Sequence, residues 1–467
     1  MVVAMMNPMK LPSFSFAPVW LVAGLLLAPS ASQAVPSFAR QLDMQCIACH
    51  TEYPLLNNLG RQFKLTGYTL AAGNSELPPL AVMFLPSFTH SQLSQAGGAA
   101  PGFKDNNNFA LTQASLFYAG RLFGPYASDL FGKDGAKIAN KFGIFLQTTY
   151  DGIAKAWHWD NAELRFASTG EIAGRPATYG FYLNNNPTLQ DPWNSTPAWG
   201  FPLTRSGLAP TPAAATLIDG GLAQQVGGAG AYVFVDDSIY LDVAAYRTLD
   251  ARFQQKVGID PTGETQVTGL APYWRAAWSH PVGNGSVELG TFGLAASTYP
   301  GRDASAGTDR LLDLGFDAQV QAAFGRHDLT ALLSWIHERE AWNASQTLGN
   351  TTNRADHLQS LKLTLDYLYD KTYGAAVQFF TADGSRDALL YAGSAAGSPL
   401  SDGLVLQLNY LPFNKAGGPA AWSRSNVKLS LQYTRYNRFD GASHNYDGLG
   451  HNAADNNTLY LEAWIAF

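Results

Sequence analysis

The chain contains two cysteines, and both lie in the pentapeptide Cys46-Ile47-Ala48-Cys49-His50. Two cysteines separated by two residues and followed at once by a histidine form the pattern through which c-type cytochromes attach haem. Cys46 and Cys49 would hold the porphyrin through thioether bonds, and His50 would be the proximal ligand of the iron. The alternative, half of a zinc site, lacks a second pair of ligands. The motif therefore predicts one covalently bound haem c.

The motif does not supply a sixth ligand for the iron, and two downstream side chains are candidates. Met83 offers a thioether, and a methionine paired with a histidine raises the potential of a haem. His90 is the nearest downstream imidazole. The two residues are seven positions apart, so in a strand only one of them can point inward. We favour Met83 as the distal ligand and keep His90 as the alternative.

The first 34 residues have the composition of an export signal. One positive charge, Lys10, precedes an apolar stretch over 14–27, and Ser32-Gln33-Ala34 offers a cleavage site of small residues. The mature chain should begin near Val35, so haem would be attached outside the cytoplasm. Removing Lys10 leaves 29 basic against 36 acidic residues, a net charge of −7. This charge argues against nucleic acid as a partner.

From about residue 80 onward, apolar and polar residues alternate in segment after segment. In the segment 404–410, three leucines and a tyrosine alternate with Val405, Gln407 and Asn409. A period of two is typical of strands that have one apolar and one polar face. No stretch after the signal approaches the roughly 18 apolar residues of a membrane-spanning helix. Sixteen such segments begin near Leu80, Phe109, Asn140, Trp157, Arg175, Leu222, Ser238, Pro272, Ser286, Arg310, His327, His357, Tyr373, Asp402, Ser425 and Thr458.

The connections between these segments alternate in length. One set is mostly short, as in Asp236-Asp237 and Gly325-Arg326, and the other is mostly long and rich in Gly, Asn and Asp. An even number of strands with short turns at one end and long loops at the other is typical of bacterial outer-membrane barrels. A soluble β-sandwich, the alternative, gives no reason for this asymmetry. The sequence therefore predicts a 16-stranded antiparallel transmembrane β-barrel over 80–467, embedded in outer-membrane lipid.

Residues 35–79 form a segment of different character, which carries the haem motif and then shows partly helical apolar spacing. A chain of about 40 residues rarely buries enough surface to fold alone. The haem and the barrel would therefore supply part of its core. We expect a monohaem cytochrome c segment that lies in the barrel lumen as a plug or at the periplasmic side.

Three further stretches are distinctive. They are Pro36-Ser37-Phe38-Ala39-Arg40-Gln41 before the haem motif, Gly60-Arg61-Gln62-Phe63-Lys64-Leu65 with Gly67-Tyr68 after it, and the tryptophan-rich stretch 185–201. With the haem motif, they resemble the fused monohaem cytochrome-porins of the bacterial outer membrane, best known as ferrous iron oxidases. The resemblance covers the whole mature chain. One departure is Leu42-Asp43, where we expect Thr-Gly, and it bears on the local haem surface.

The resemblance implies an outer-membrane electron conduit. Extracellular ferrous iron would give one electron to the haem, and a periplasmic cytochrome c or similar carrier would accept it. This is the activity of an iron:cytochrome c oxidoreductase. Two alternatives stay open, a diffusion porin with a structural haem and a surface oxidoreductase for a different donor.

Two long loops could contribute to such a function. The last loop offers oxygen and nitrogen ligands that suit a divalent ion, although turn-rich loops have the same composition for backbone reasons. The side chains in question are Asp440, His444, Asp447, His451 and Asp455. In the tryptophan-rich loop, Trp193 and Trp199 would either narrow the pore and shield the haem or pack the loop itself.

Overall fold

The computed structural model describes residues 36–467 except 53–54, 72–77, 198–202, 262–264 and 416–424. The predicted export signal and the predicted start of the mature chain near Val35 lie outside the described residues. Within the described ranges, no helix is both long and apolar enough to cross a membrane.

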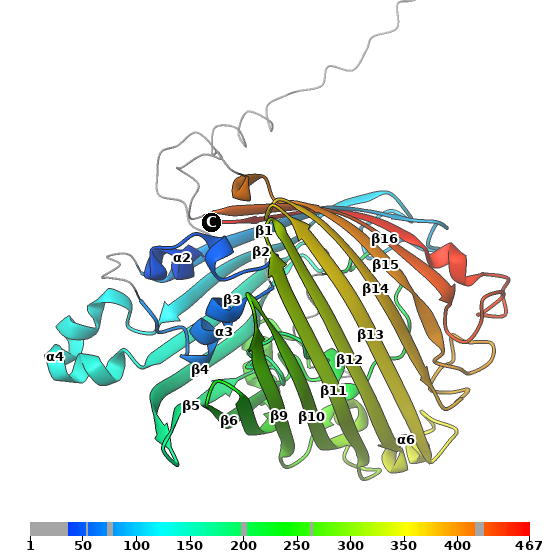
Figure 1. Cartoon of the computed structure of the whole chain (residues 1–467). Coiled ribbons are helices and arrows are strands. Elements are labelled where there is room, and N and C mark those ends of the chain that lie inside the picture. The colour runs from blue at the N-terminus through cyan, green and yellow to red at the C-terminus, as the bar shows by residue number, and fades with distance from the viewer. Residues whose placement is uncertain (1–35, 53–54, 72–77, 198–202, 262–264, 416–424) are drawn as a thin grey trace, which may run out of the picture. The chain divides into compact units, whose positions relative to one another are not determined.

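The described strands form one closed antiparallel sheet. Each long strand pairs with the next along the chain, and β1 (Leu80–Ser91) pairs with both β2 (Asn108–Arg121) and β17 (Thr458–Ala466). Figure 1 shows β9 to β16 side by side in one wall. Besides sixteen long strands, the sheet includes the two-residue β8 (Gln266–Val267). The prediction of a 16-stranded barrel is confirmed, and each predicted strand start lies within four residues of the observed one.

The remaining strands are β3 (Phe142–Asp151), β4 (Ala156–Ile172), β5 (Arg175–Asn184), β6 (Val226–Val235), β7 (Ile239–Thr248), β9 (Ala271–Val282), β10 (Gly285–Tyr299), β11 (Asp309–Phe324), β12 (His327–Ala341), β13 (Ala355–Tyr369), β14 (Tyr373–Gly384), β15 (Ser401–Tyr410) and β16 (Asn426–Arg438). The α-helices belong to the N-terminal segment and to the connections between strands. They are α2 (Pro36–Leu42), α3 (Asn58–Leu65), α4 (Ala127–Ala139), α5 (Ala251–Lys256) and α6 (Asn343–Leu348).

The outer face of the barrel is apolar and the inner face is polar. In β15, Leu406 and Leu408 are exposed on the outer face, whereas Gln407 and Asn409 are buried on the inner face. The alternation thus directs leucine to lipid and amides to the lumen. A closed sheet also bonds its backbone groups within itself, which lipid requires because it offers no hydrogen-bond partners.

The two ends of the barrel differ as the loop lengths predict. In the short turn between β6 and β7, Asp236 and Asp237 have φ values of 58° and 48°, as a type I′ hairpin turn requires. The start of β1 and the end of β17 lie at this short-turn end, which is the periplasmic end in barrels of this class. The connection between β2 and β3 is an exception, because it contains the helix α4, which the sequence reasoning did not predict.

Helix α2 ends at Leu42, directly before Asp43, where the chain departs from the family pattern. The Met44 amide donates to the carbonyl of Ala39 at 3.0 Å, and the Asp43 amide donates to the carbonyl of Arg40 at 3.3 Å. This pair of bonds is a Schellman turn, whose residue after the helix adopts the left-handed conformation that glycine favours. Asp43 has that conformation, with φ of 51°. The backbone therefore explains why glycine is expected at this position.

Replacing Asp43 with glycine is expected to stabilise the N-terminal segment by up to about 1 kcal/mol, because glycine has no Cβ to clash in the left-handed region. The change is measured by unfolding the segment in guanidinium, with protease sensitivity as the signal that monitors unfolding. Asp43→Asn is the control, since asparagine also tolerates this conformation and should leave the midpoint near wild type. A lower midpoint for Asp43→Gly would contradict the backbone account.

Candidate functional site

The N-terminal segment, residues 36–71, is bonded to inward-facing side chains on several parts of the barrel wall. Glu52 accepts a hydrogen bond from Asn409 of β15 at 2.5 Å and lies 3.8 Å from the ammonium of Lys428 in β16. Arg61, in α3, donates to the amide oxygen of Gln321 in β11 at 2.7 Å. Strands far apart around the barrel therefore hold the same segment.

A buried ion pair on β4 anchors the end of this segment. Arg165 lies 2.8 Å from Glu163, and both side chains are fully buried. Tyr68 donates its hydroxyl to Glu163 at 2.9 Å, and Arg165 donates to the backbone carbonyl of Lys64 at 2.9 Å. The Arg165 guanidinium also lies 5.7 Å from the centre of the Tyr68 ring, a cation–π distance. The pair thus binds the segment through both its backbone and a side chain.

The long connection between β5 and β6 also contacts the segment. Asp191 organises this loop by accepting backbone amides of Trp193 and Thr196, each at 3.0 Å. Lys64 donates to the Asp191 carbonyl at 2.5 Å and to the Asn194 side chain at 2.8 Å. The segment, the loop and the wall therefore share one buried polar network.

The two alternatives for the loop tryptophans were to narrow the pore or to pack the loop itself. Trp193 packs the loop. Its side chain is 1% exposed and packs edge-on against Tyr240 with ring centres 5.5 Å apart. It does not line the cavity described next. Trp199 lies outside the described residues.

A cavity of about 440 Å³ lies between the segment and the barrel wall, and all the predicted haem-attachment residues line it. Cys46, Cys49 and His50 line it from the segment, and Met83 lines it from β1. Much of the remaining wall is apolar and aromatic. These residues are Phe38, Leu42, Phe63, Leu85, Phe117, Phe145 and Trp464. A predominantly apolar cavity with a few polar groups is typical of a cofactor site.

The geometry of His50 suits a metal ligand. Its Nδ1 lies 3.2 Å from the carbonyl oxygen of Leu55. Because a carbonyl only accepts, Nδ1 must donate, and the lone pair of the neutral ring is then on Nε2. Metal-binding histidines are commonly oriented by such a bond from the other ring nitrogen. The backbone around His50 therefore selects the tautomer that an axial ligand needs.

The motif is also held close to the start of α3. The side-chain oxygen of Asn57 caps this helix by accepting a hydrogen bond from the Gly60 backbone amide at 3.1 Å. The backbone amide of Asn57 donates to the Cys49 carbonyl at 2.9 Å. A Cβ built on Gly60 would lie 2.3 Å from that same carbonyl oxygen. Glycine at position 60 is therefore required for the helix to approach the haem motif this closely.

The two thiols do not have the properties of a reactive pair. Burial raises the pKa of Cys46 and of Cys49 to about 11. Catalytic and metal-binding thiols instead have a lowered pKa. The two thiols therefore do not suit dithiol redox chemistry.

The two candidates for the distal ligand lie in different places. Met83 is 4% exposed, faces inward and lines the cavity. His90 lies on the other face of β1, near the long-loop end, where its Nδ1 is 2.9 Å from the side-chain oxygen of Asn107. His90 does not line the cavity. The seven-residue spacing therefore separates them as expected, and the His90 alternative has no access to the site.

The iron site considered in the last long loop does not form. Among the described residues, no group of three or more His, Cys, Asp or Glu side chains could hold a metal ion. Asp440 accepts the Ala213 amide at 3.1 Å, Asp447 pairs with His451, and Asp455 belongs to a capping box. Asp447 and Asp455 stabilise the last loop itself, and Asp440 joins it to the connection between β5 and β6. These are the roles in loop structure that turn-rich composition also predicts.

The sequence reasoning missed the polar residues that hold the segment. Glu163 and Arg165 are two apart in a strand, so the alternation alone puts both on one face. Two opposite charges, two residues apart on the inner face of one strand, were the available signal. Asp191 offered none, because its role depends on how the loop folds into the lumen.

No protein-family model matches the chain, and a comparison with curated proteins found no match. The solved anion-selective porin from Comamonas acidovorans is similar, with 12% identity, a TM-score of 0.46 and coverage of 83% of this chain and 98% of that porin. The outer membrane channel DcaP of Acinetobacter baumannii has 10% identity and a TM-score of 0.44, covering 85% of this chain and 100% of the channel. This chain's own closed sheet, apolar outer face and loop asymmetry define it as an outer-membrane β-barrel.

Lys64 makes the attachment of the segment dependent on pH. Burial lowers its pKa to about 7, against the opposing effect of Asp191 and Glu163, and Arg165 and Arg275 lower it further. The unfolded segment binds more protons between pH 7 and about 10.5, so its stability rises with pH there, by at most about 1.4 kcal/mol per pH unit. Proteolysis of the segment should therefore slow from pH 7 to pH 9.

Lys64→Met should remove this dependence on pH, because the methionine cannot titrate. Lys137→Met on α4 is the control, since that lysine is largely exposed and pairs only with Asp134. Equal slopes in wild type and Lys64→Met would show that another group controls the attachment.

Proposed function

We propose that this barrel is an electron conduit that oxidises extracellular ferrous iron through one covalent haem c and passes the electron to a periplasmic carrier. The observation that carries the proposal is that Cys46, Cys49, His50 and the inward-facing Met83 line a single cavity. Haem would supply a one-electron couple there. Each cycle oxidises one ferrous ion to ferric, and the periplasmic carrier is reduced by one electron.

The residues present fit the cofactor. Cys46 and Cys49 would form the two thioethers, His50 would be the proximal ligand, and Met83 is the thioether on the barrel side of the cavity. The aromatic and aliphatic wall would exclude water from the porphyrin. A histidine and methionine pair, with such exclusion, favours a raised potential, which suits accepting an electron from iron.

The position of the cavity suits a periplasmic exit. Met83 is the fourth residue of β1, and Trp464 is near the end of β17. Both lie toward the short-turn end of the barrel, which is the periplasmic end in this class. The long loops remain on the side where the donor would enter. An electron, and not the iron, would then cross the rest of the barrel.

The test is the haem absorbance of intact outer membranes that contain this protein when ferrous iron is added. We expect the reduced haem spectrum to form, and to decay when a periplasmic c-type cytochrome is supplied on the inner side. Control membranes contain the same barrel with both Cys46 and Cys49 replaced by alanine. A colourless wild-type protein, or a haem that ferrous iron does not reduce, would overturn the proposal.

The barrel itself favours a second candidate, a diffusion porin with a structural haem, since sixteen-stranded barrels commonly enclose aqueous channels. The two candidates differ in conductance. The N-terminal segment is bonded to β4, β11 and β15, which lie on different sides of the closed sheet, so the conduit should conduct ions poorly in planar bilayers. Stable, large conductance together with an unreactive haem would favour the porin.

A further inference from the structure

A second cavity, of about 400 Å³, adjoins the one that would hold the haem. Asn194, Leu203, Thr204 and Arg205 line both cavities and therefore form the partition between them. Along β17, Thr458 and Tyr460 line the second cavity, and the later residues of the strand line the first. The second cavity, which we name the antechamber, thus lies toward the long extracellular loops.

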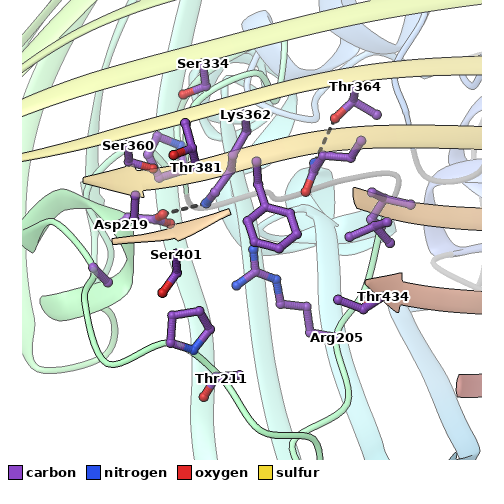
Figure 2. A pocket seen from close by; sticks show the side chains of 18 of the residues that line it. Arg205, Thr211, Asp219, Ser334, Ser360, Lys362, Thr364, Thr381, Ser401 and Thr434 are labelled. Atoms are coloured by element: carbon purple, nitrogen blue, oxygen red, sulfur yellow. Dashed lines mark hydrogen bonds and ion pairs between the residues drawn. The ribbon is translucent and has the colours of Figure 1, made fainter. Parts of the chain in front are cut away.

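The antechamber wall is rich in hydroxyl groups, as Figure 2 shows. They come from several strands and point into the same space. The labelled ones on strands are Ser334, Ser360, Thr364, Thr381, Ser401 and Thr434, and Thr211 is labelled on the connection between β5 and β6. Such groups can donate hydrogen bonds to the oxygens of a ligand as well as accept them.

The charge of the antechamber is positive. Among its described lining residues, the charged ones are Arg205, Asp219 and Lys362. Lys362 and Asp219 form an ion pair of 2.5 Å and neutralise each other. Arg205 is exposed in the cavity and, within the part of the chain that the structure describes, makes neither a hydrogen bond nor an ion pair. One guanidinium therefore faces this space without a partner.

A bare metal cation is the wrong ligand for such a chamber. Its single carboxylate is already paired with Lys362, and an unpaired guanidinium would repel a cation. A guanidinium instead binds carboxylates through two parallel hydrogen bonds. A cavity of this size is within the range that holds small molecules.

We propose that the antechamber binds a small carboxylate anion at Arg205, and that ferrous iron reaches the haem partition as a carboxylate complex. The delivery of iron as a carboxylate complex rests on the proposed function, whereas the binding of a carboxylate at Arg205 does not. In this arrangement Arg205 binds a carboxylate of the complex and the surrounding hydroxyls bind its remaining oxygens. The complexed iron would lose one electron to the haem across the partition and leave as the ferric complex.

The direct test is calorimetric titration of the purified haem-loaded full chain with citrate, in wild type and in Arg205→Gln. We expect citrate to bind the wild type and to bind at least tenfold more weakly to Arg205→Gln. Magnesium ion alone should not bind. Arg175→Gln is the matched control, because Arg175 is the exposed first residue of β5, at the short-turn end, and pairs with Asp236. Citrate should bind this variant as it binds wild type.

Two results would overturn the site: equal binding of citrate to wild type and to Arg205→Gln, or no citrate binding to wild type. The second result can be accompanied by a changed haem potential in Arg205→Gln. That combination would mean that the guanidinium holds a carboxylate of the haem itself. A second measurement compares haem reduction by ferrous citrate and by ferrous sulfate, where Arg205→Gln should slow only the former. Citrate binding with a haem that neither form reduces would retain the site and defeat the proposed function instead.

Discussion

Replacing His50 with alanine is expected to lower haem reduction by ferrous iron at least about 100-fold, since loss of even an outer partner of a metal ligand costs about 10–100-fold. The two thioethers would remain, so the haem would stay attached while its iron loses the proximal nitrogen. The bond from His50 to the Leu55 carbonyl, which selects the tautomer, would also be lost. Stopped-flow absorbance after mixing with ferrous iron measures the rate, and the pigment of the denatured polypeptide confirms attachment.

His90→Ala is the matched control for this experiment. It also removes a histidine, but one on the outward face of β1 and outside the cavity. Its reduction rate should equal that of wild type. Met83→Ala should keep the haem and the proximal ligand, and change the spectrum of the oxidised haem. Wild-type kinetics in His50→Ala, or a loss of reduction in His90→Ala, would refute the ligand assignment.

Replacing Arg165 with methionine is expected to release the N-terminal segment from the wall. The substitution would leave Glu163 as a buried carboxylate without its charged partner, which costs about 3–5 kcal/mol. It would also remove the bond to the Lys64 carbonyl and the contact with the Tyr68 ring. Protease cleavage within residues 36–71 should become fast, and the conductance of the barrel in planar bilayers should rise.

The double variant Arg165→Met with Glu163→Gln separates the loss of one charge from the loss of the contacts. Because a neutral pair leaves no buried charge, it should recover part of the protection. A second control is Arg175→Met, which breaks an exposed pair with Asp236 and should have little effect. Slow proteolysis in Arg165→Met would show that the bonds of Glu52 and Arg61 to the wall hold the segment without β4.

The fold could be predicted because its pattern is local and repeated. A strand with one face in lipid and the other in a polar lumen must alternate at every second residue, and sixteen such segments with unequal turns allow few other architectures. The connection containing α4 escaped prediction because a helix in one turn does not disturb that pattern. The proposed haem-attachment motif is equally local, because five adjacent residues contain both thiols and the histidine that we propose as the proximal ligand.

Only the tertiary structure decided which distant parts of the chain contact one another. Alternation separates Met83 from His90, but only the closed barrel brings Met83 to the cavity that the cysteines line. Asp191, Arg165 and Arg205 acquire their roles from partners and spaces that loop folding creates. Short-range patterns determine which way a side chain faces. What it faces depends on the packing of segments that are far apart in the chain, as in the bond from Tyr68 to β4, 95 residues away, and the bond from Glu52 to β15, 357 residues away.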